Sequence, residues 1–209
     1  MGIKYDQPDT LSSKSEIKQR ALSYRDTSVS DVIRIKTKLK YALVRCPQLL
    51  YALHNEEYES ELFDDDGNLI EDGEWDRYLG DNIRPYLMYP EVQTKAKNYI
   101  SFKVEFDEYP SVNDAYMYCE VTLVVMVDMK DITQANGIPR HDEIAAILVE
   151  RLNWSNITGT QCRLISSSEG YTDSNYVTRT LVFRSTNLNN KIKNRNGTPY
   201  LSSNAEVFN

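Results

Sequence analysis

The sequence predicts an α+β fold: a four-stranded, largely antiparallel sheet with helices packed on one face, plus extended N- and C-terminal arms. Three observations lead to this prediction. The run Tyr116–Asp128, YMYCEVTLVVMVD, is the most apolar stretch of the chain and contains neither Gly nor Pro. Residues 99–107 alternate between apolar and polar side chains, as a half-buried strand does. Residues 144–152 repeat apolar side chains every three or four positions, as one face of a helix does.

A chain of 209 residues is long enough for one domain with appendages. We expect an N-terminal arm over residues 1–28, a single domain over 29–186 with an acidic insert at 56–81, and a C-terminal arm over 187–209. Large apolar residues are few and dispersed in both arms. The arms therefore cannot bury enough surface to fold alone.

The domain is expected to begin with a helix. Ser30-Asp31 is typical of a helix start, and Pro47 should break the helix near Arg45. Between these points the apolar residues keep a spacing of three or four, at Val32, Ile35, Leu39, Leu43 and Cys46. A second helical piece is expected over residues 47–55.

The acidic insert resembles a calcium loop only superficially. Three aspartates, Asp64, Asp65 and Asp66, precede Gly67. An EF-hand loop has Gly at position six and an acid at position one, and here position one would be Leu62. We therefore expect a solvated loop or hairpin, which Trp75 and Tyr78 anchor on an apolar surface.

The second half of the chain alternates strands and a helix. The chain changes character from Ile83, and we expect an extended linker from Arg84 to Pro90. The turn and strand signals then predict strands at 99–107, 116–128, 161–166 and 176–185, a helix from Pro139 to about Asn153, and a long loop or hairpin tip at 167–175. The central strand, 116–128, should be covered on both faces over its second half. Eight residues hold the apolar phase of these elements and are expected in the core: Phe102, Val104, Leu123, Val125, Ile147, Leu148, Leu181 and Phe183.

Composition argues against several functional classes. The net charge of −7 disfavours general nucleic-acid binding. The three cysteines, Cys46, Cys119 and Cys162, are odd in number and far apart, so we expect buried free thiols. There is no apolar leader and no run long enough to span a bilayer, so a cytoplasmic protein with no membrane contact is expected. The 15 tyrosines fit either an interface or a compositional bias.

No catalytic, cofactor or metal site is predicted. His54 and His141 stand alone, without the spacing of zinc ligands, and the chain has no GxSxG, Walker A or GxGxxG motif. Acids and a histidine do gather in sequence near the end of the central strand, at Asp128, Asp131, His141, Asp142 and Glu143. A helix N-terminus with favourable charges explains them best. A small metal-dependent nuclease is the alternative.

The order of elements carries a resemblance. It reads helix, strand, strand, helix, strand, strand, with the segments YISFKVEFDEY, YMYCEVTLVVMVDM, IPRHDEIAAILVERLN and YVTRTLVFRS. Over residues 84–186 this resembles the tail-terminator and head–tail joining (neck) proteins of tailed bacteriophages. The long N-terminal arm, the acidic insert and the C-terminal tail depart from that pattern.

The resemblance implies a non-enzymatic structural virion protein without cofactors. Such subunits form rings, usually hexamers, between portal or adaptor proteins and the tail, and DNA passes through the lumen without specific binding. The protein would be located in the neck or tail of the virion, which is assembled in the host cytoplasm. The expected assembly residues are Trp75 and the basic tail residues Lys191, Lys193 and Arg195, which would face Asp64, Asp65 and Asp66 of an adjacent subunit. A sheet-mediated binding module is a further alternative.

Overall fold

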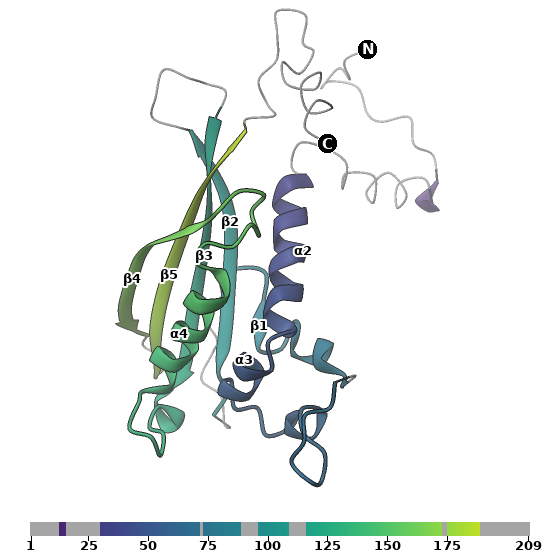
Figure 1. Ribbon diagram of the computed structural model, residues 1–209, viewed down its shortest axis with the longest axis vertical. Coiled ribbons are helices and arrows are strands. Elements are labelled where there is room, and N and C mark those ends of the chain that lie inside the picture. The colour runs from purple at the N-terminus through teal and green to yellow at the C-terminus, as the bar shows by residue number, and fades with distance from the viewer. Residues whose placement is uncertain are drawn as a thin grey trace, which may run out of the picture.

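The computed structural model describes residues 13–15, 30–71, 73–88, 96–108, 116–172 and 175–188 (Figure 1). The predictions for the two arms, including those for Lys191, Lys193 and Arg195, fall almost entirely outside these residues.

The chain forms a five-stranded sheet, not the four-stranded one expected. The strands are β1 (Ile83–Arg84), β2 (Tyr99–Glu108), β3 (Tyr116–Asp128), β4 (Arg163–Tyr171) and β5 (Tyr176–Leu188), in the spatial order β1-β2-β3-β5-β4. All neighbours are antiparallel except β1, which pairs parallel with β2. The α+β class and the central position of β3 are therefore confirmed. β1 is not among the predicted strands, because a strand of two residues has no alternation to read.

Three helices lie on one face of the sheet, as predicted (Figure 1). They are α2 (Ser30–Val44), α3 (Pro47–Ala52) and α4 (Arg140–Leu152). The break between α2 and α3 falls at Arg45 and Cys46, close to the predicted position. Pro47 is the first residue of α3, where its missing amide hydrogen costs no helical hydrogen bond.

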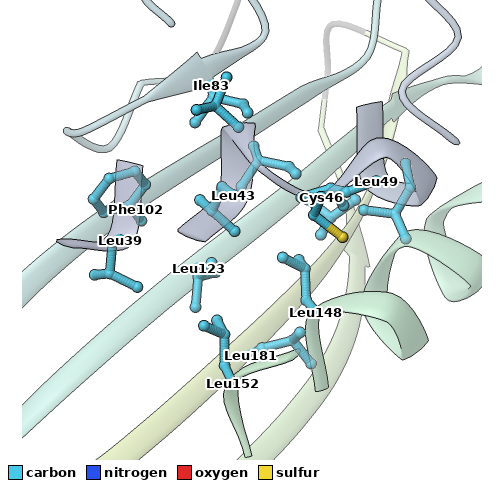
Figure 2. Packing of buried hydrophobic residues seen from close by; sticks show 14 of the residues in the cluster. Leu39, Leu43, Cys46, Leu49, Ile83, Phe102, Leu123, Leu148, Leu152 and Leu181 are labelled. Carbon is cyan, nitrogen blue, oxygen red and sulfur yellow. The ribbon is translucent and has the colours of Figure 1, made fainter. Parts of the chain in front are cut away.

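The main core lies between the helices and the sheet (Figure 2). Leu39 and Leu43 of α2 and Leu148 of α4 point toward side chains of β2, β3 and β5, including Phe102, Leu123 and Leu181. Of the eight expected core residues, Ile147 is only half-buried and the others are buried. Ile147 lies at the margin of the α4 stripe, which Ile144, Leu148 and Leu152 form instead.

A second, smaller core lies on the opposite face of the sheet. Tyr99, Val124, Met126 and Tyr176 form it. β1 and the chain after it lie against this face: the guanidinium of Arg84 in β1 lies 4.4 Å from the Tyr99 ring centroid, and the hydroxyl of Ser101 in β2 donates to the Met88 carbonyl. Every residue of β3 from Leu123 onward is buried, which confirms that its second half is covered on both faces.

β4 is longer than expected and takes over much of the predicted loop at 167–175. The expectation placed it at 161–166, whereas the strand runs from Arg163 to Tyr171. Its middle reads Ser-Ser-Ser-Glu, because an edge strand that is solvated on both faces needs no apolar alternation. β5 likewise continues three residues beyond the expected end, to Leu188.

Candidate functional site: the open edges of the sheet

β4 is an edge strand that is open on its outer side in the described part of the chain. It pairs with β5 from Arg163 to Tyr171, and no described strand lies beyond it. Its sequence, RLISSSEGY, contains neither the proline nor the lysine that commonly blunts an edge. A β-bulge between Leu164 and Ser166 leaves Ile165 47% exposed. The outward backbone groups of β4 are thus available to a strand of another chain.

The opposite edge is open too, but it has a different character. β1 pairs with β2 only at Ile100 and Ser101, so β2 has no described neighbour on that side beyond Ser101. The exposed part of this strand carries charge, including an ion pair between Lys103 Nζ and Glu105 Oε2 at 2.6 Å. The sheet therefore ends in two unlike edges.

An aromatic and arginine cluster lies at the start of β4. Trp154 is 54% exposed and has a backbone φ of +66°, a conformation that bulky residues rarely adopt. Its backbone amide donates to the Cys162 carbonyl, which holds the chain in this conformation. The Arg163 guanidinium lies 4.5 Å from the Trp154 ring centroid. Exposed Trp and Arg dominate the energetics of many protein interfaces.

A row of four charged side chains crosses the sheet on the face away from the helices. Glu105 of β2 is opposite Glu120 of β3, Glu120 is opposite Arg184 of β5, and Arg184 is opposite Arg163 of β4. Only the inner pair of unlike charges meets, with Arg184 Nε donating to Glu120 Oε1 at 2.6 Å. The two like-charged neighbours oppose each other across adjacent strands, which is unfavourable.

The three aspartates of the insert are not equivalent. Asp64 accepts hydrogen bonds from the backbone amides of Asp66 and Asn68, at 3.0 and 2.7 Å. The bond from Asn68 above all lowers the pKa of the Asp64 carboxyl. Asp65 and Asp66 are exposed and have no side-chain partner among the described residues. Asp64 therefore forms the turn, while its two neighbours present charge to solvent.

Trp75 anchors the insert, as the sequence predicted. The indole Nε1 donates to the Glu61 carbonyl at 2.9 Å, and the ring is 6% exposed. Gly73 makes this close approach possible, because a Cβ there would lie 2.1 Å from the Glu61 oxygen. Tyr78 and Leu62 are buried beside the same core. As an assembly residue, Trp75 offers a neighbour little of its surface.

The acids of the nuclease alternative do not converge. Asp131 lies in a polar cluster that joins α3, β3 and α4: its carboxylate accepts from Asn98 Nδ2 at 2.6 Å and lies 3.2 Å from Arg140 Nε and 2.9 Å from His54 Nδ1. Arg140 also donates to the Ala52 carbonyl. These contacts hold the end of the sheet to the helices, which is a structural role.

The other acids are engaged separately. Asp128 is buried and accepts from the Lys130 amide, and Glu143 accepts from Gln134. Asp142 pairs with Arg179 of β5. Over the described ranges, no three His, Cys, Asp or Glu side chains gather in a way that could hold a metal ion.

His141 is a buried histidine without hydrogen bonds. It is 2% exposed, and neither ring nitrogen has a hydrogen-bond partner in the described structure. Nε2 lies 3.6 Å from an oxygen of Asp142 and 3.7 Å from one of Glu169. The side chain thus fills space between α4 and β4 and presents no free nitrogen to solvent.

All three cysteines are buried free thiols, as predicted. Burial raises the pKa of the Cys162 thiol. None of the helices among the described residues is long and apolar enough to cross a membrane.

Sequence reasoning missed the charge row and the Trp154 cluster. Each member of the row is an ordinary polar residue in the solvent phase of its strand. Their alignment depends on strand register and on the order β2-β3-β5-β4, which no single segment encodes. The only local signal was the placement of each of these four charges in the polar phase of its own strand.

Comparison with known proteins gives one family. No curated protein matches the sequence. The family model YomW matches residues 47–185, from the start of α3 through nearly all of β5. The match takes in the whole sheet except the last residues of β5 and leaves α2 outside. Because it spans about two thirds of the 209 residues, the chain belongs to the YomW family.

Proposed function

We propose that this protein is a non-enzymatic structural subunit of the bacteriophage head–tail connector, a tail terminator or neck protein that assembles into a ring. The observation that carries the proposal is the pair of open, unlike edges at the two ends of one sheet. A contact between two different surfaces of identical subunits generates a ring when the rotation closes. Ring closure would also cover both edges, which otherwise expose unpaired backbone groups.

Two further properties support the proposal. The element order resembles that of the tail-terminator and neck proteins over residues 84–186. The net charge of −7 suits a lumen through which DNA passes without being held. A hexamer that contacts portal or adaptor proteins on one side and tail proteins on the other is the assembly we propose, located in the virion.

The nuclease alternative has less support. Three of its acids, Asp131, Asp142 and Glu143, contact Arg140, Arg179 and Gln134 respectively, and Asp128 accepts from the Lys130 amide. The alternative of a sheet-mediated binding module uses the same open edges, and it differs in the stoichiometry it predicts.

The mass of the particle in solution tests the proposal. Sedimentation velocity and native mass spectrometry would follow the purified full chain over a range of concentrations, alone and with purified tail-tube or portal protein. We expect a discrete closed oligomer, six copies in the simplest case. A monomer under all conditions would refute the ring, and a one-to-one complex would favour the binding module. Divalent-metal-dependent cleavage of DNA or RNA would favour the nuclease.

A further inference from the structure

We propose that copies of this chain join head to tail through their sheets, with the outer edge of β4 in one copy against the outer edge of β2 in the next. In this contact Arg163 of one copy faces Glu105 of the next. The inference rests on the proposed ring and specifies its interface. Three properties of the sheet support it.

The first property is the direction of the strands. Successive neighbours in β2-β3-β5-β4 are antiparallel, so β4 runs opposite to β2. When a second copy continues the sheet in the same orientation, its β2 is antiparallel to the preceding β4. The alternation of directions then passes through the contact without interruption, and antiparallel pairing is the more favourable kind.

The second property is the charge row. Within one subunit it reads acid, acid, base, base from Glu105 to Arg163, so an acid stands at one edge of the sheet and a base at the other. Arg163 stacks on Trp154 and has no carboxylate partner among the described residues. Glu105 has only the exposed Lys103 of its own strand. If the next copy continues the sheet so that the two charge rows are aligned, Arg163 of one copy lies beside Glu105 of the next.

The third property is the row of apolar residues that lies one position along the strands from the charge row. Leu164 lies opposite Phe183, which is level with Val121 and Val104. The alignment that brings Arg163 to Glu105 therefore brings Leu164 to Val104 of the next copy, on the helix face of the sheet. Both side chains are apolar and lie at the margin of the core. β1 occupies the β2 edge at Ile100 and Ser101, so the contact is confined to the part of β2 beyond them.

A two-fold contact of β4 with β4 does not offer Arg163 an acid. Antiparallel pairing about the middle of the strand would bring Arg163 level with Tyr171 of the other copy. The only acid on β4, Glu169, pairs with Arg179 and lies on the helix face, whereas Arg163 lies on the other. The row therefore favours a head-to-tail contact, which can close into a ring, over a symmetric dimer.

Mixing two charge variants tests this contact. Arg163→Glu alone places Glu beside Glu105 of the next copy, and Glu105→Arg alone places Arg beside Arg163. Like charges across an interface are strongly unfavourable, so we expect the dissociation constant of the oligomer to rise roughly tenfold or more in each variant. An equimolar mixture should recover the oligomer, with the two variants alternating around it. Native mass spectrometry resolves such mixed particles by mass.

Matched controls change the same charges elsewhere. Lys38→Glu on α2 and Glu150→Arg on α4 change the net charge by the same amounts as the two test variants, at exposed positions away from the contact. Both controls should leave assembly at the wild-type level, alone or mixed. Thermal unfolding checks that every variant folds. If a charge reversal prevents folding, the neutral pair Arg163→Gln and Glu105→Gln should still each weaken assembly.

The outcomes separate the interface from the ring. Wild-type-like assembly of both single variants, or no recovery in the mixture, would overturn the Arg163–Glu105 contact while leaving the ring in place. A wild-type chain that never assembles, alone or with tail proteins, would overturn the proposed function and this contact together.

Discussion

Side chains of the same chemical type have different roles in this protein, and their hydrogen bonds distinguish them. Asp64 accepts from two backbone amides and closes the turn that ends at Asn68. Asp65 and Asp66 accept no such bonds among the described residues. The sequence shows three equal carboxylates, so only the geometry identifies the one that shapes the loop.

The pH dependence of this turn follows from the lowered pKa of Asp64. A carboxyl whose pKa is lower in the folded state stabilises that state above its unfolded pKa, and the contribution is lost as pH falls through the folded value. We expect Asp64→Ala to loosen the turn at neutral pH, and Asp65→Ala to leave it unchanged. Amide hydrogen exchange of Asp66 and Asn68 measures this. Equal exchange in both variants would contradict the assignment.

At the scale of elements, the sequence predicted those with a regular pattern. The β3 run and the alternation in β2 gave nearly their observed bounds, and so did the α4 stripe, because each buries one continuous apolar face. β1 and most of β4 were missed. β1 is held by its parallel pairing with β2, and β4 has no buried face that requires apolar residues. Of the two open edges, the one formed by β4 therefore lay in the part least readable from sequence, whereas β2 itself was predicted.

A charge in the middle of β3 tests its place in the core. Leu123 is fully buried between Phe102 and Leu181 on the adjacent strands. Leu123→Asp should lower the free energy of unfolding by roughly 4 kcal/mol or more, since the carboxylate has no partner there. Val125 is a poorer probe, because Arg179 lies opposite it and could pair with an aspartate.

Thr122→Asp is the control for this experiment, since Thr122 is half-buried on the other face and lies opposite Lys103. Urea unfolding followed by circular dichroism gives both values. A Leu123→Asp protein as stable as Thr122→Asp would show that the main core lies elsewhere.

At the scale of the whole molecule, the end of β5 is joined to the loop after α4. The Asn187 side chain donates to the Thr158 carbonyl and accepts from the Thr160 hydroxyl, so these bonds hold the last residues of β5 against that loop. A truncation that begins at 187 would remove these bonds together with the tail.

A truncation that begins at 190 separates folding from assembly. Ordering the 20 residues 190–209 would oppose folding by roughly 20–40 kcal/mol of backbone entropy. The five large apolar or aromatic side chains there, Ile192, Tyr200, Leu201, Val207 and Phe208, would return roughly 8–15 kcal/mol on full burial. We therefore expect the subunit truncated at 190 to unfold at nearly the wild-type temperature, and truncation at 187 to lower that temperature.

If Lys191, Lys193 and Arg195 contact a neighbouring subunit, the truncation at 190 should also weaken assembly, and restoring residues 190–196 should recover part of it. Calorimetry measures the unfolding temperature of the wild type and of the three truncated chains, and sedimentation measures their assembly. A large loss of thermal stability on truncation at 190 would show that the tail is part of the subunit's own fold. Unchanged assembly on the same truncation would show that the tail is not part of the interface.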